Sequence, residues 1–183
     1  MASPTRPAWI ACALAATGAA ALSIPAWITG LPLVVSSLGP SLLLAAATPD
    51  ARESSAGSLA SGHGIAVVAA LAVIAAFGLG GEPSAFVAGV TTARMAAVPA
   101  ALVLTLAGML AVGRLHAPAG ATALLVVLGI VRPGSDVVVL AATIAYTAGV
   151  VALFPALAAR LAGARPQTRR APARRGRRVR RPG

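Results

Sequence analysis

Two short polar motifs, one in each half of the chain, contain the residues best suited to chemistry. The motifs are Gly39-Pro40-Ser41 and, after His116, Pro118-Ala119-Gly120-Ala121-Thr122. Each surrounds a hydroxyl residue with glycine and proline and leads into a leucine-rich run, which predicts a helix that begins abruptly within an apolar layer. Such a helix directs unpaired N–H groups and about half a positive charge toward whatever faces it. The paired motifs therefore favour the binding of a small anion.

Side chains within these motifs add hydrogen-bond donors and one titratable group. The hydroxyls of Ser41 and Thr122 can donate to an anion, and His116 can hydrogen-bond it or exchange a proton with it near neutral pH. The alternative for both motifs is a kinked helix that packs closely through small residues. The alternative for His116 is a side chain that only fixes the turn. The presence of two such motifs favours the anion site.

Two further residues are weaker candidates for lining a substrate path. His63 lies where the third apolar segment begins, and Ser61-Gly62-His63 is also typical of an ordinary entry from loop to helix. Arg94 is an ionisable residue next to an apolar run, which makes it a functional candidate. An arginine near a helix end can instead extend to the membrane interface, and for Arg94 we favour that interpretation.

The remaining polar residues do not indicate catalysis or a resident cofactor. The 2 histidines are far apart, and the 4 acidic residues are scattered without the spacing of metal ligands. No Ser-His-Asp or Cys-His combination and no phosphate-binding loop is recognisable. We therefore expect a protein that is not an enzyme and that binds neither a metal nor a cofactor. Its single cysteine, Cys12, excludes an internal disulfide.

Composition assigns the chain to the membrane. Of its 183 residues, 58% are hydrophobic and only 10% are charged, whereas soluble domains carry about 25% charged residues. The apolar residues form blocks close to the length that spans a bilayer. The fold class expected is all-α, a polytopic transmembrane helical bundle. Arginine as the sole basic residue type and abundant alanine suggest a bacterium with a GC-rich genome.

Six apolar segments can be distinguished. Full helices are predicted over residues 8–24, 64–80, 86–112 and 137–159, and broken segments over 26–47 and 118–131, with a loop at 48–62. The second broken segment would be roughly 21 Å long as a helix, short of the ~30 Å hydrocarbon core. Division near Pro83 leaves a helix, a broken segment and a helix on each side. If the broken segments cross the membrane, the halves form an inverted repeat; if they re-enter, four spans remain and the halves are parallel.

The distribution of arginine favours six crossings. The net charge of +11 is concentrated in residues 160–181, which contain ten of the arginines. With that tail in the cytoplasm, six crossings place Arg6, Arg52 and Arg114 inside and Arg132 outside. Four crossings would instead place Arg52, Arg114 and Arg132 outside. Either arrangement puts both termini in the cytoplasm. We expect a multi-pass protein of the bacterial plasma membrane.

Three regions follow from these patterns. They are a short cytoplasmic N-terminus (residues 1–7), a transmembrane domain (8–159) and a disordered Arg-rich cytoplasmic tail (160–183). The tail suits binding to anionic membrane lipids. It lacks aromatic residues for base stacking, so specific binding of nucleic acid is not expected. The small number of spans makes a homo-oligomer plausible.

The second motif also carries a resemblance to a known family. His116-Ala117-Pro118 followed by Ala-Gly-Ala-Thr resembles the signature of the HPP family of integral membrane proteins, named for a His-Pro-Pro motif. Ser37-Leu38-Gly39-Pro40-Ser41 and Gly62-His63 also resemble that family's pattern, and the resemblance spans residues 33–157. Ala117 departs from it, because it replaces the first proline. Some family members are similar to nitrite transporters of plastids and cyanobacteria.

These observations lead to two functional hypotheses. The first is a transporter of a small inorganic anion, nitrite or a similar one, bound near mid-membrane between Ser41 and Thr122 by the two helix N-termini. Transport would be passive or coupled to H⁺. The second is a non-transporting membrane scaffold or anchor, whose polybasic tail binds lipid or a partner.

Overall fold

The computed structural model describes residues 7–31 and 36–163, and these residues form helices joined by short connections. The helices are α1 (Ala8–Thr29), α2 (Leu38–Ala47), α3 (Ala56–Ala76), α4 (Ala85–Ala88), α5 (Thr92–Ala111), α6 (Ala119–Val127), α7 (Ser135–Ala152) and α8 (Phe154–Leu161), with single 3₁₀ turns η1 (Arg52–Ser54) and η2 (Leu79–Gly81). Residues 1–6 and residues 164–183 of the predicted tail lie outside the described part of the chain.

Four helical stretches are long and apolar enough to cross a membrane. They are α1, α3, α5 and the combined stretch of α7 and α8 over Ser135–Leu161. The two expected broken segments contain the short helices α2 and α6, of 10 and 9 residues, which extend only about 15 Å each. The prediction of an all-helical membrane bundle with four full helices and two half-helices is therefore confirmed.

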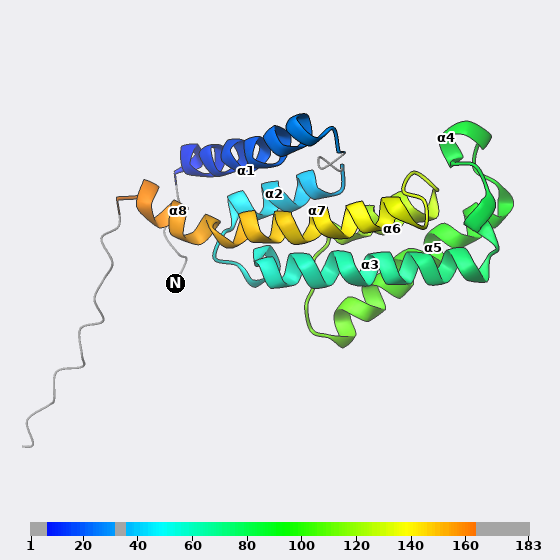
Figure 1. Cartoon of the computed structure of the whole chain (residues 1–183). Coiled ribbons are helices and arrows are strands. Elements are labelled where there is room, and N and C mark those ends of the chain that lie inside the picture. Colours follow the sequence, from blue (N-terminus) through cyan, green and yellow to red (C-terminus); the bar gives the residue numbers. More distant parts are fainter. Residues whose placement is uncertain (1–6, 32–35, 164–183) are drawn as a thin grey trace, which may run out of the picture.

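The chain direction alternates along the bundle. Figure 1 shows α2 running back alongside α1, α3 running forward, α5 returning, α6 running forward beside α3, and α7 returning. The start of α1 and the end of α8 lie at the same end of the molecule. Helices α1, α2 and α3 thus run in directions opposite to those of α5, α6 and α7, respectively. This is the inverted arrangement that the six-crossing interpretation requires.

The end of α1 and the start of α3 differ from the sequence-based expectation. Pro25 was expected to end the first helix, but α1 continues through it to Thr29 and ends where Gly30 takes a left-handed φ of 67°. Residues 48–62 were expected to form a loop, but α3 already begins at Ala56, where the Ser55 side chain accepts a hydrogen bond from the Ser58 N–H. This cap satisfies one of the unpaired donors of the first turn.

The two longest predicted helices are interrupted. The segment 86–112 is divided by Gly89, whose φ of 75° ends α4, and α5 begins after the Thr91 cap. Pro99 is accommodated within α5. The last segment breaks at Leu153, and Pro155 lies in the first turn of α8, a position where its missing N–H costs little.

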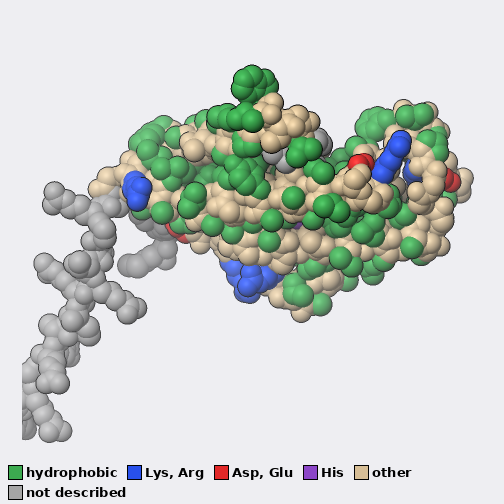
Figure 2. Space-filling view, in the orientation of Figure 1, with side chains coloured by type: hydrophobic (Ala, Val, Ile, Leu, Met, Phe, Trp, Pro, Cys, Tyr) green, Lys and Arg blue, Asp and Glu red, His purple; other side chains and the backbone are tan. Residues whose placement is uncertain are grey.

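The core is built around α3 and relies on close packing of small residues. Helix α3 contacts α5, α6 and α7 and is the most buried of the four spanning stretches. Six fully buried alanines on the contacting helices α3, α5 and α6 form what we call the alanine seam: Ala66, Ala70, Ala97, Ala101, Ala119 and Ala123. Small side chains let helix backbones approach closely where lipid supplies no hydrophobic driving force. Large apolar side chains cover much of the outer surface (Figure 2).

Candidate functional site

The two half-helices meet at their N-terminal turns. Thr122, the fourth residue of α6, donates from its hydroxyl to the Oγ of Ser37, the residue that precedes α2, over 2.8 Å. Ser41, the fourth residue of α2, lies 2.9 Å from the Nε2 of His116, which precedes α6. Each half-helix therefore contacts the entry turn of the other through equivalent positions, as expected for two related halves.

His63 of α3 joins these two contacts into one buried network. Its Nε2 lies 2.9 Å from the Ser41 Oγ, and its Nδ1 lies 2.7 Å from the Thr122 Oγ1. At the far end, the Nδ1 of His116 lies 2.8 Å from the backbone carbonyl of Glu53. All five side chains, which we call the half-helix cluster, have an exposed fraction of 0%: Ser37, Ser41, His63, His116 and Thr122.

Glycine allows the entry turn of α6 to approach α3 at this point. A Cβ at Gly62 would lie 2.7 Å from the Cβ of His116 and 3.4 Å from that of Ala119. Behind the ring, the backbone N–H of His116 points to the Sδ of Met109 in α5, 3.4 Å away. The entry turn that carries His116 is thus held between α3 on one side and α5 on the other.

The structure differs in part from the anion cradle expected from the two motifs. It brings Ser41, His116 and Thr122 together, but the His63 ring fills the position between Ser41 and Thr122 where the anion was expected. Gly39 and Pro40 are exposed and face away from the cluster.

The backbone that follows the second motif is also engaged. The N–H groups of the first residues of α6 donate to carbonyls of the turn: Ala119 to His116, Gly120 to Ala117 and Ala121 to Pro118, over 3.0 to 3.1 Å. Pro118 supplies one of these acceptors and has no N–H of its own. The first turn of α6 is therefore capped by its own entry segment.

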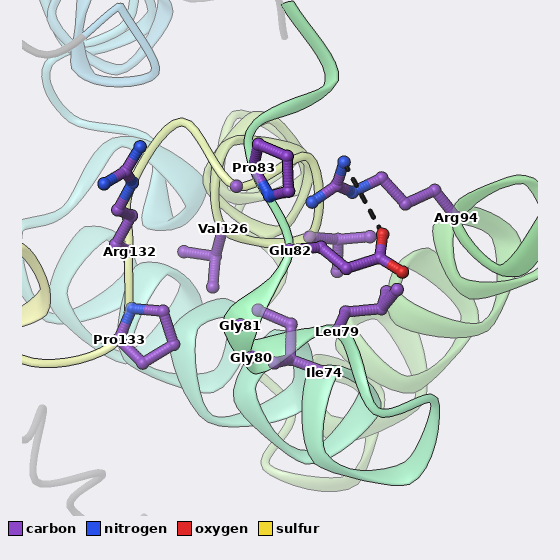
Figure 3. A pocket seen from close by; sticks show the side chains of 12 residues that line it. Ile74, Leu79, Gly80, Gly81, Glu82, Pro83, Arg94, Val126, Arg132 and Pro133 are labelled. Carbon is purple, nitrogen blue, oxygen red and sulfur yellow. Dashed lines mark ion pairs between the residues drawn. The ribbon is translucent and has the colours of Figure 1, made fainter. Parts of the chain in front are cut away.

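A second polar site lies at the end of α3 opposite its Ser55 cap. Figure 3 shows a pocket with Arg94 and Glu82 facing each other on one side and Arg132 and Pro133 on the other. Its volume is about 320 Å³, and its remaining walls come from the ends of α3 and α6 and from the Leu79–Pro83 connection. This pocket was not predicted; Glu82-Pro83 indicates only a helix stop in the sequence.

Arg94 is the dominant charge of this pocket. Its side chain is only 1% exposed, so the interpretation of Arg94 as an interfacial residue is wrong. Its Nε and Nη1 have no hydrogen-bond partner among the described residues, and Glu82 approaches Nη1 only to 3.9 Å. The Thr91 hydroxyl accepts from the Arg94 N–H and so fixes the residue in the first turn of α5.

The end of α6 makes room for this guanidinium. Gly129 follows α6 with a φ of 72°, and a Cβ there would lie 3.1 Å from the Nη2 of Arg94 and 3.3 Å from the Cα of Ser84. Opposite, the Asp136 carboxylate accepts from the backbone N–H of Arg132 over 3.1 Å and holds the connection that carries Arg132. Within the described residues, no group of three or more His, Cys, Asp or Glu is placed to hold a metal ion.

The match to a protein family agrees with this architecture. The model of the HPP transmembrane region matches residues 2–168, nearly the whole chain. The chain belongs to the HPP family. No curated protein and no solved structure gives a significant match. In this HPP protein the family signature forms the entry turn of α6, with His116 in the half-helix cluster. Where the signature has its first proline, Ala117 is exposed, and its carbonyl accepts the Gly120 N–H.

Proposed function

We propose that this HPP protein transports a small inorganic anion, such as nitrite, across the membrane. The observation that carries the proposal is the buried guanidinium of Arg94, which lines a pocket and has two nitrogens without hydrogen-bond partners among the described residues. Burial of a charge costs several kcal/mol when its hydrogen bonds are incomplete, and beyond the distant Glu82 a ligand could complete those of Arg94. A substrate anion can accept a charge-assisted hydrogen bond from one of these nitrogens.

The electrostatic field of the pocket also suits a monovalent anion. Arg94 and Arg132 line it together with one acidic residue, Glu82, so the formal balance is two positive charges against one negative. Arg94 lies in the first turn of α5, where the helix dipole adds positive potential rather than offsetting the charge. One bound monovalent anion brings the formal charge of the lining to zero.

In this proposal the anion would move from the pocket to the half-helix cluster along one face of α5. Its buried residues run from Arg94 through Ala97 and Ala101 to Thr105 and Met109. The Thr105 hydroxyl is buried and has no partner within the described part of the chain, and Met109 contacts His116. The alanine seam closes this route in the present conformation, so transport requires the two inverted halves to move relative to each other.

Uptake into proteoliposomes tests the proposal. Purified protein should accumulate nitrite, nitrate or formate above the level of empty vesicles. Arg94→Gln should reduce the initial rate at low anion concentration by about 10- to 100-fold, since a charge-assisted contact contributes on the order of 1.5–3 kcal/mol. Arg94→Lys should retain part of that rate, because it keeps the charge but not the planar arrangement of donors.

A matched control separates binding from folding. Arg160→Gln changes an exposed arginine of α8 and should leave the rate unchanged, while thermal unfolding should show Arg94→Gln to be at least as stable as the unmodified protein. Equal uptake by Arg94→Gln would refute the pocket as the binding site. No accumulation of any of these anions by the unmodified protein would contradict transport and favour the scaffold hypothesis.

A further inference from the structure

The half-helix cluster has a hydrogen-bond pattern that two neutral histidines do not satisfy. The Nδ1 of His116 faces the carbonyl of Glu53, which can only accept, so this Nδ1 carries a hydrogen. Thr122 donates its hydroxyl hydrogen to Ser37, so toward His63 it can only accept. The Nδ1 of His63 therefore carries a hydrogen as well.

Both Nε2 atoms then compete for one hydrogen. In a neutral imidazole with its hydrogen on Nδ1, Nε2 is an acceptor. The Nε2 atoms of His63 and His116 both lie 2.9 Å from the Oγ of Ser41, and a serine hydroxyl has a single hydrogen to donate. With both rings neutral, one nitrogen lone pair points at the Ser41 oxygen with no hydrogen between them. One added proton completes the network.

We propose that His63, Ser41 and His116 bind one proton and pass it between the two rings, and that H⁺ is the coupling ion of the transporter. When His63 holds the proton, its Nε2–H donates to Ser41 and the Ser41 hydroxyl donates to His116. Transfer breaks the Nε2–H bond of His63 and forms an O–H bond at Ser41, while the original Ser41 O–H bond breaks and an Nε2–H bond forms at His116. Ser41 is unchanged, and the proton has moved from one ring to the other.

The surroundings link this proton to an anion. The carbonyl of Glu53 in η1 faces the His116 ring, and the side chain of Glu53 is exposed. The side chain of Arg114, in the connection before α6, is also exposed. From α7, the buried Thr143 and Thr147 donate to carbonyls of their own helix. Neither ring has a carboxylate partner within the described residues, so an anion that enters along α5 would neutralise the added charge. By linkage, the anion and the proton then raise each other's affinity.

Nitrogen NMR can count this proton directly. The chain contains 2 histidines, so ¹⁵N-histidine labelling of protein purified without a histidine tag reports on this cluster alone. As the pH is lowered from about 8 to 5, the spectra should change from two neutral rings to a state with both Nδ1 atoms protonated and one hydrogen shared by the two Nε2 atoms, because burial without a carboxylate opposes the added charge. In Ser41→Ala the shared signal should disappear. Ser61→Ala is the matched control, because the Ser61 hydroxyl donates only to carbonyls of its own helix, and should resemble the unmodified protein.

The coupling rests on the proposed function, whereas proton binding does not, and two measurements keep them apart. In vesicles with an internal pH dye, an inward nitrate gradient should acidify the lumen, and Ser41→Ala should abolish this acidification. Two neutral rings throughout the pH range, or a shared signal that survives in Ser41→Ala, would overturn the proton site. Anion uptake without acidification would overturn the coupling alone. A shared proton in a protein that takes up no anion would refute the transport function and leave the proton site standing.

Discussion

At the scale of single residues, each of the two polar sites depends on a glycine beside it. Gly62 lets the entry turn of α6 reach α3, so that His116 can contact Ser41, and Gly129 leaves space for the guanidinium of Arg94. Neither glycine could be replaced by alanine without displacing a neighbouring atom. The positions of both sites are therefore set by small residues on other elements as much as by the polar residues themselves.

Gly62→Ala should separate the entry turn of α6 from α3. The new Cβ would lie 2.7 Å from the Cβ of His116, and overpacking of this kind destabilises a protein by about 1–3 kcal/mol. We expect a lower temperature of unfolding in detergent and loss of the shared histidine signal. Gly64→Ala is the control, because a Cβ there meets nothing within 4 Å and alanine favours the helix. Equal stability of the two variants would contradict the close approach described here.

The sequence revealed one site in part and the other hardly at all. The glycine and proline residues around Ser41 and Thr122 mark local breaks, so the two half-helices could be predicted. His63 was predicted only at the entry to the third segment and not within a helix, because the Ser55 cap was not recognised and the helix was expected to begin at residue 64. The burial of Arg94 depends on Gly129, a contact between distant segments to which no local pattern points.

At the scale of elements, the half-helices depend on their neighbours. Helices of 9 or 10 residues are marginal on their own, and α6 is held along α3 and α5 while α2 packs against α1 and α7. Their ends are also the functional points, since α2 and α6 meet at their starts and the end of α6 borders the pocket. A small shift of α6 along α3 would therefore change both sites together.

Gly129→Ala should impair the pocket through the end of α6. Alanine is strained at a φ of 72°, and its Cβ would lie 3.3 Å from the Cα of Ser84, a backbone atom that cannot turn away. The left-handed conformation alone costs a non-glycine residue about 1–2 kcal/mol. We expect a higher half-saturating anion concentration in the uptake assay. Gly149→Ala in α7, where a Cβ meets nothing within 4 Å, should behave as the unmodified protein, and equal affinity of both variants would argue against the pocket.

At the scale of the whole molecule, the described arginines divide between the two ends of the bundle. Exposed Arg52 lies in η1, just before α3, exposed Arg160 lies in α8, and exposed Arg114 approaches Gly57 near the start of α3. The start of α3 and the end of α8 lie at the end of the bundle where α1 begins (Figure 1). Arg132 precedes α7 at the opposite end, beside the pocket. Because cytoplasmic ends of membrane proteins carry an excess of arginine, this division predicts that the Arg94 pocket opens away from the cytoplasm.

Labelling of single cysteines with a membrane-impermeant maleimide tests this orientation. In a Cys12→Ala background, Arg132→Cys should react in intact bacterial cells, whereas Arg52→Cys and Arg160→Cys should react only after the membrane is permeabilised. Each variant removes one arginine and leaves the ten-arginine region intact apart from Arg160 itself, so the orientation should survive the substitution. Labelling of Arg52→Cys in intact cells would reverse the assignment, and labelling of all three from outside would contradict the division into two ends. If the predicted pattern is found, an anion that reaches Arg94 from outside lies on the same side as the protons of an inward gradient, which is compatible with the proposed coupled uptake.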